Sequence, residues 1–226
     1  MTSDRSVVAD SLGVGLATGA YGVSFGAIAT GAGLDVWQAC AMSLAVFTGA
    51  SQFAFIGVIA SGGNPLAGAF TALLLGSRNM FYGLSIAPLL RLTGPARIVS
   101  SHLVMDESTA MTITRDTTRQ ARLGFFWTGL SIFVLWNGTT LIGALAGTAM
   151  GDPRDYGLDA AVGAAFLGLL WPRLNSWGAR LTALLAAAVA LGLVPFTAAG
   201  LPIIIGGAVA VIVGLIRHVT LPEGLP

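Results

Sequence analysis

Long apolar segments dominate the chain, and the longest of them ends in an unusual interruption. No charged side chain occurs from Val36 to Ser77, and the next residue is Arg78, inside an apolar stretch that continues to Leu90. A transmembrane helix needs about 20 mainly apolar residues, whereas barrel strands show segments of about 10 residues that alternate strictly. These runs are long and do not alternate, so the pattern predicts an all-α, polytopic bundle of membrane helices.

The apolar runs predict about six or seven transmembrane helices in a single domain, residues 1–226, with some helices broken by glycine-rich motifs. The last three runs hold only about 14–15 residues, which is short for a bilayer unless the helices are broken or the membrane thins. The second run is a full span unless it is re-entrant. The candidate spans are residues 7–28, 37–60, 66–90, 123–150, 158–171, 181–194 and 202–216.

Composition agrees with a membrane protein and excludes several chemistries. Hydrophobic residues make up 55% of the chain and charged residues 9%, whereas soluble domains contain about 25% charged residues. All 11 basic residues are arginine, so the chain lacks the lysine of a P-loop or a Schiff base. Cys40 is the single cysteine, and neither a nucleophile–base pair nor a metal or cofactor motif is present. We therefore expect no enzyme, no cofactor and no metal.

The distribution of arginines predicts the orientation of the carboxyl-terminal half. The connection at about residues 91–122 contains five arginines and is therefore expected on the cytoplasmic side. Counting crossings from there places Arg217, and with it the carboxyl terminus, in the cytoplasm. Polar residues at three- and four-residue spacing favour an amphipathic helix on the membrane surface in this connection, or equally a solvated connector. Binding of nucleic acid is the least favoured reading.

Arg78 and three clusters of glycine and polar residues are candidates for a substrate site. A charge near the bilayer centre costs about 2.5–3.5 kcal/mol on insertion scales, so it persists when it faces a cavity or a partner. Arginine suits a carboxylate, and Phe47 with two further phenylalanines is expected to form an apolar pocket. Close helix packing is the competing explanation for the small residues. The candidate substrate-binding residues are Ser24, Phe25, Thr48, Ser51, Gln52, Phe53, Arg78, Asn79 and Tyr82.

Three carboxylates are candidates for coupling transport to an ion. Asp106 and Glu107 lie between the basic connection and the next helical pattern, and Asp159 begins a predicted span. Carboxylates inside membrane transporters often carry protons. Capping of helix amino termini is the alternative explanation, since acidic residues stabilise that end.

At these clusters the chain resembles the AzlC-type branched-chain amino acid permease family, which includes YgaZ-like valine exporters. The resemblance implies an inner-membrane exporter of branched-chain amino acids that works with a small AzlD-type membrane subunit. The Gly-Ala-Ser-Gln-Phe and Arg-Asn-x-x-Tyr-Gly elements are its most specific parts. The matching residues are Gly22 to Gly26, Phe47 to Phe53, Arg78 to Gly83, Asp106 to Ser108, and Gly157 to Asp159 with Phe166.

The leading hypothesis is a proton-coupled exporter of valine, leucine or isoleucine in the prokaryotic inner membrane. Arg78 would bind the substrate carboxylate, while the hydroxyl and amide groups of the clusters would supply hydrogen bonds. An ion channel or pore subunit and a membrane scaffold subunit are the alternatives. Saturable, amino-acid-selective flux distinguishes the exporter from both.

Overall fold

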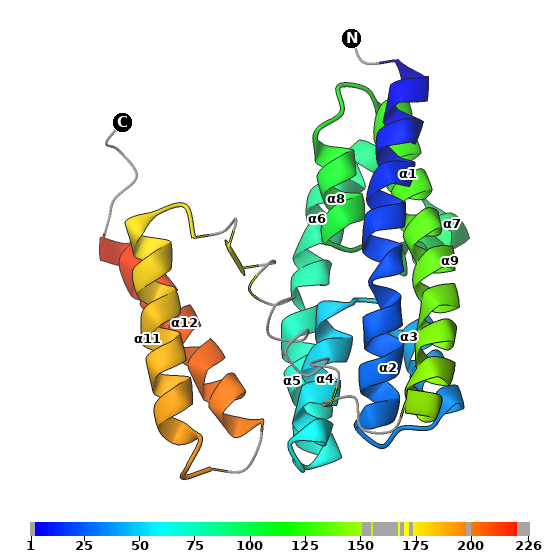
Figure 1. Cartoon of the computed structure of the whole chain (residues 1–226). Coiled ribbons are helices and arrows are strands. Elements are labelled where there is room, and N and C mark those ends of the chain that lie inside the picture. Colours follow the sequence, from blue (N-terminus) through cyan, green and yellow to red (C-terminus); the bar gives the residue numbers. More distant parts are fainter. Residues whose placement is uncertain are drawn as a thin grey trace.

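The computed structural model describes residues 3–150, 155, 167, 170–171, 174–197 and 200–220, and regular structure within them is helical (Figure 1). This confirms the predicted all-α membrane bundle. Asp159 and most of the predicted span at residues 158–171 lie outside the described residues. The helices are α1 (Asp4–Ala20), α2 (Gly22–Gly31), α3 (Val36–Val46), α4 (Ala50–Ala60), α5 (Pro65–Gly76), α6 (Arg78–Leu90), α7 (Gly94–Ser101), α8 (Asp106–Ile113), α9 (Thr118–Met150), α11 (Trp177–Leu193) and α12 (Leu201–Thr220).

Two long parallel elements form the spine of the bundle. Asp4–Gly31, which is α1 and α2 with a break at Tyr21, and Thr118–Ala149 of α9 are long and apolar enough to cross a membrane. Glycines allow these helices to touch backbone to backbone: a methyl group on Gly26 would overlap the carbonyl oxygen of Thr140. Small residues at the contact are the usual means of close helix association in lipid.

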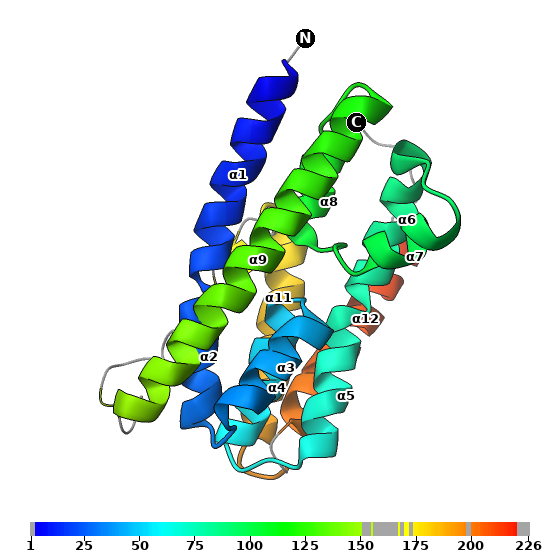
Figure 2. The ribbon, with the colours of Figure 1, turned by 90° about the vertical axis from the view of Figure 1, so that its right-hand side faces the viewer.

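The predicted span at residues 37–60 is two half-length helices, so the re-entrant alternative is the correct one. Each of α3 and α4 has 11 residues, which at 1.5 Å per residue is about half of a 30 Å bilayer core. The chain reverses at Phe47 and Gly49, whose φ angles of 31° and 58° are left-handed. Both helices lie in the lower half of the bundle (Figures 1 and 2).

Residues 65–113 repeat this plan with the opposite direction. The predicted span at residues 66–90 is broken at Ser77 into α5 and α6, which run upward, and α7 and α8 then form a second half-length hairpin in the upper half (Figure 2). The expectation of a surface helix or a solvated connector is wrong for α8, because Ser108, Thr109 and Thr112 are buried and α8 packs against α9. The helices α1 to α4 thus form one unit, two helices in line followed by a half-length hairpin. The helices α5 to α8 form a second unit with the same plan that runs in the opposite direction.

The last described helices, α11 and α12, form a separate hairpin beside α5 (Figure 1). The contact uses small residues again, since a methyl group on Gly200 would lie 3.3 Å from Ala67 Cβ and 3.4 Å from Val58 Cγ1.

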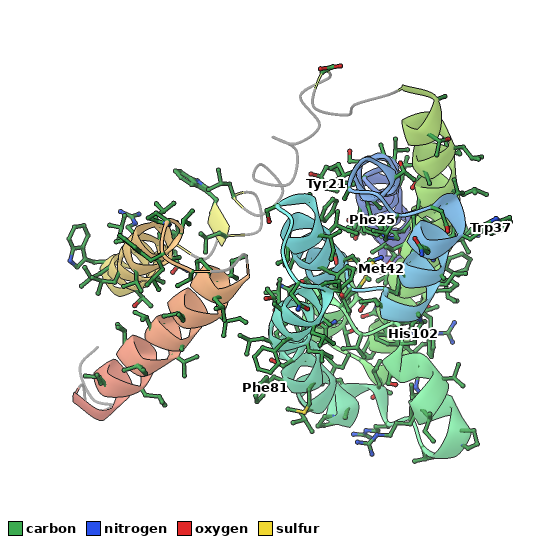
Figure 3. The ribbon with its side chains drawn as sticks, turned by 90° about the horizontal axis from the view of Figure 1, so that it is seen from below. Tyr21, Phe25, Trp37, Met42, Phe81 and His102 are labelled. Atoms are coloured by element: carbon green, nitrogen blue, oxygen red, sulfur yellow. The ribbon has the colours of Figure 1, made fainter. Side chains whose placement is uncertain are left out.

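Large apolar side chains cover the outer surface, and Trp37 projects away from the bundle with 80% of its surface exposed (Figure 3). Such an exposed apolar surface fits contact with lipid.

Candidate functional site

The helix interruptions of the bundle meet around one cavity. The break between α1 and α2, the turn between α3 and α4, the start of α6 and the start of α8 all contribute to a cavity of about 330 Å³, and α9 lines one side of it. This volume lies within the range of small-ligand sites. Its lining residues are Ala17, Thr18, Tyr21, Phe47, Thr48, Gly49, Ala50, Phe53, Arg78, Met105, Asp106, Glu107, Ile132 and Trp136.

Arg78 and Asp106 form an ion pair at this cavity. Arg78 Nη2 lies 2.6 Å from Asp106 Oδ2, and the side chains are only 20% and 19% exposed. The hydroxyl of Tyr82 donates a hydrogen bond of 2.8 Å to Asp106 Oδ1. Two residues of α6 thus hold a carboxylate at the first position of α8, whose N-cap is Met105 rather than Asp106. The positive end of the α8 dipole adds to this attraction.

Glu107 gives the cavity a second carboxylate. It follows Asp106 in the first turn of α8 and lines the same cavity. Among the described residues, no basic side chain lies within ion-pair distance of Glu107. One guanidinium therefore faces two carboxylates, and the lining carries one more acidic group than basic groups. Such a site favours a ligand or ion that brings positive charge.

Several buried polar atoms at the cavity have no partner within the described structure. Thr48 Oγ1, Arg78 Nε and Trp136 Nε1 each belong to a lining residue and make no hydrogen bond there. Ser51 Oγ and Gln52 Nε2, from the same turn of α4, are buried and unpartnered as well. Because a buried polar group without a partner costs about 1–3 kcal/mol, a concentration of them indicates a place where a ligand or water completes the bonds.

Tyr21, Phe53 and Trp136 form an aromatic wall in the same cavity as the charged groups. The ring of Phe53 lies 5.7 Å from that of Tyr21 and 6.2 Å from that of Trp136. Phe25 stands behind this wall, 5.7 Å from Phe53 and fully buried. Figure 3 labels Tyr21, at the break between α1 and α2, and Phe25 of α2. The cavity therefore combines an apolar side with a charged side.

The structure brings together part of the set that the sequence predicted. Thr48, Phe53, Arg78, Asp106 and Glu107 line the cavity, and Tyr82 reaches it through Asp106. Five others do not line it: Ser24 and Phe25 lie on α2, Gln52 lies on α4, Ser51 lines a groove between α3, α4 and α5, and Asn79 lines a separate cavity between α6 and α7.

Sequence reasoning missed Tyr21, Met105 and Trp136 as lining residues. The one signal for Trp136 is its place in the middle of a span, far from the membrane interfaces where tryptophan is usual. Within the described part of the chain, no group of three or more histidine, cysteine, aspartate or glutamate side chains is arranged to hold a metal ion.

Broken helices around a cavity that contains charged groups are typical of one class, multi-span membrane proteins such as secondary transporters. A model of the AzlC protein family matches residues 13–150, more than half of the chain, and the chain belongs to the AzlC family. The four cavity-lining breaks all fall within the matched residues.

Two known proteins are similar to this chain. An uncharacterized membrane protein of Archaeoglobus fulgidus is 32% identical over 170 residues, which are 74% of each chain. The branched-chain amino acid transport protein AzlC of Bacillus subtilis is 24% identical over 148 residues, which are 65% of this chain and 58% of that protein. No solved structure matches this chain significantly.

Proposed function

We propose that this protein exports branched-chain amino acids across the inner membrane, as the large subunit of a two-component, proton-coupled secondary transporter. The observation that carries the proposal is the central cavity, whose lining pairs an aromatic wall with one guanidinium and two carboxylates. A free amino acid with an apolar side chain has the matching parts: a carboxylate, an ammonium group and a branched hydrocarbon. The name of the Bacillus subtilis relative supports the same substrate class.

Each part of the substrate has candidate partners at the cavity. Arg78 and Thr48 offer donors to the carboxylate, and the hydroxyl and amide groups nearby extend this set. Phe47, Phe53 and, behind them, Phe25 supply the apolar surface. A few placed polar groups on apolar walls are the common design of small-molecule sites.

The carboxylates Asp106 and Glu107 are the proposed proton-coupling groups. Asp106 is neutralised by Arg78 and Tyr82, which leaves one carboxylate in excess at the cavity. A proton and an ammonium group cannot both occupy that carboxylate. Binding of one therefore favours release of the other, and a proton entering in exchange for an amino acid leaving is export.

A small membrane subunit and a cytoplasmic carboxyl terminus complete the proposal. A broad apolar groove of about 1170 Å³ runs between α3, α4 and α5 and supports the partner, because it offers space for another membrane helix. The count of arginines in the short loops supports the orientation.

Counterflow of radiolabelled valine in proteoliposomes tests this function. Protein is reconstituted with and without the small subunit, with unlabelled valine inside, and a pH gradient is imposed. We expect saturable uptake of label that leucine and isoleucine inhibit, that lysine does not inhibit, and that responds to the gradient. Conductance without saturation would instead identify a channel, and folded protein without exchange or conductance would favour a scaffold.

A further inference from the structure

We propose that the substrate lies across the cavity in one orientation, with its carboxylate at the amino terminus of α4 and its ammonium group at Glu107. This inference rests on the proposed function. It adds that the site has two poles: a carboxylate-binding pole on the α3–α4 hairpin and an ammonium-binding pole on the α7–α8 hairpin. It also moves the main carboxylate contacts from Arg78, whose Nη2 is occupied by Asp106, to the backbone of α4.

The amino terminus of α4 is left open toward the cavity. Two helices that begin at the lower end of the bundle have side-chain caps, Asp35 on α3 and Asn64 on α5. The N-cap of α4 is Gly49, which has no side chain to accept from the first-turn amides. Gly49 and Ala50 line the cavity. Uncapped amides at a positive helix end attract a carboxylate.

Buried side-chain donors without partners belong to residues that line the same cavity as this helix end, and they suit the same ligand group. Trp136 lines the cavity, is only 4% exposed, and has an indole N–H without an acceptor. Its ring edge packs over the turn, with Cη2 3.7 Å from the place that a Cβ on Gly49 would take. Thr48 Oγ1 and Arg78 Nε are buried beside the same cavity without partners. A carboxylate supplies acceptors for these donors.

The opposite pole belongs to the α7–α8 hairpin. Glu107 lines the cavity, whereas the neighbouring Asp106 is already held by Arg78 and Tyr82. An ammonium group carries three donors and compensates the excess negative charge of the lining. With both ends fixed, the side chain of the amino acid turns toward the aromatic wall of Tyr21 and Phe53.

Two halves of valine separate the poles in a binding experiment. Isovalerate keeps the carboxylate and the branched chain but lacks the amine, while isobutylamine keeps the amine but lacks the carboxylate. Each competes with radiolabelled valine, or is titrated directly, on purified full-length protein. The variants are Glu107→Gln for the ammonium pole, and Thr48→Val and Trp136→Phe for the carboxylate pole. Asp116→Asn and Thr114→Val, at exposed positions of the α8–α9 connection, are the matched controls.

We expect Glu107→Gln to weaken binding of valine and isobutylamine by about tenfold to a hundredfold and to leave isovalerate unchanged. Thr48→Val and Trp136→Phe should weaken valine and isovalerate and leave isobutylamine unchanged. Trp136→Phe keeps an aromatic six-membered ring and removes the pyrrole part of the indole with its N–H, so it tests the pole even where Thr48→Val fails to fold. Equal losses for both analogues, or the reverse pattern, would overturn the orientation while valine binding stands. Wild-type protein that binds none of the three ligands would overturn the proposed function and the orientation together.

Discussion

The α3–α4 and α7–α8 hairpins have the same backbone plan and opposite chemistry. In each, a half-length helix begins at the cavity, and the side chain at its third position accepts from the N-cap amide: Gln52 from Gly49 at 3.1 Å, and Ser108 from Met105 at 3.1 Å. The first two helical residues are Ala50 and Ser51 in α4 but Asp106 and Glu107 in α8. Similar backbones thus present uncapped amides from one hairpin and carboxylates from the other. The two sides of the site therefore differ in charge and favour one orientation of the substrate.

The two hairpins are also held differently by their neighbours. The α8 helix packs against α9 at Gly124, where a methyl group would overlap the carbonyl oxygen of Met111. The α4 helix packs against α5 at Gly68, where a methyl group would meet the ring of Phe55 at 3.2 Å. Backbone cannot move aside as a side chain can, so the acidic hairpin is fixed more rigidly than the neutral one.

Removal of the charge contact of the α7–α8 hairpin is expected to have the largest effect. Arg78→Ala leaves Asp106 mostly buried with Tyr82 as its remaining named partner, and loss of one member of such a pair costs about 3–5 kcal/mol. We expect a markedly lower midpoint of thermal unfolding in detergent and no valine counterflow.

Two further variants make this result specific. Arg119→Ala breaks a pair of 2.8 Å with Asp4, but Arg119 is 80% exposed, so the cost should stay below about 1 kcal/mol. The double change Arg78→Ala with Asp106→Ala removes the uncompensated charge and should be more stable than Arg78→Ala alone. Equal stability of the single and double variants would show that the pair does not hold the hairpin.

A pair of glycine substitutions tests the difference in rigidity. Gly124→Ala forces α8 away from α9 and should cost about 1–3 kcal/mol, as overpacking commonly does. Gly68→Ala should cost less than about 1 kcal/mol, because the Phe55 ring can shift and alanine favours a helix. Thermal unfolding of both proteins beside Gly138→Ala, where the added methyl meets nothing within 4 Å, gives the comparison. A larger loss for Gly68→Ala would contradict it.

The sequence predicted the chemistry of the site better than its assembly. Arg78 and Thr48 stood out because charge and glycine interrupt apolar runs, and the carboxylates of α8 because carboxylates often carry protons in transporters. The sequence did not show that these residues lie together. The Arg78–Asp106 pair joins two separate helices, which come into contact only because the α7–α8 hairpin inserts into the bundle. Residues 37–60 fit a full span by length and composition alone, and only the turn at Phe47 and Gly49 divides them.

The burial of α8 was hidden for a different physical reason. Its hydroxyl side chains bond to their own backbone, as Thr112 Oγ1 does to Ser108 O at 2.6 Å. A polar residue satisfied in this way can be buried against a neighbouring helix, although by composition it resembles a solvent-exposed one.

Loss of the cap at the tip of the acidic hairpin should have a moderate effect. Ser108 is fully buried, and its Oγ accepts from the Met105 amide and donates to Leu103 O at 2.6 Å. Ser108→Ala leaves two backbone groups unsatisfied and should cost about 1–2 kcal/mol in thermal unfolding. Ser85→Ala, which removes an exposed hydroxyl bonded to Tyr82 O, is the control and should be near neutral. If both variants unfold alike, the cap does not stabilise the tip.

The smallest expected effect on stability concerns the contact between the two hairpins themselves. His102 Nε2 lies 2.9 Å from the carbonyl oxygen of Leu44, and its ring lies 5.7 Å from that of Phe47, but the residue is exposed. His102→Ala should therefore cost less than about 1 kcal/mol. If the hairpin tips separate during transport, the same change lowers the barrier to opening and raises the rate of valine counterflow by up to about fivefold. His102→Phe keeps the ring contact but lacks the hydrogen bond. Its stability and its rate of counterflow should lie between those of the wild-type protein and those of His102→Ala. Unchanged counterflow in both variants would mean that the tips stay together through the cycle, and that the difference between the hairpins serves binding alone.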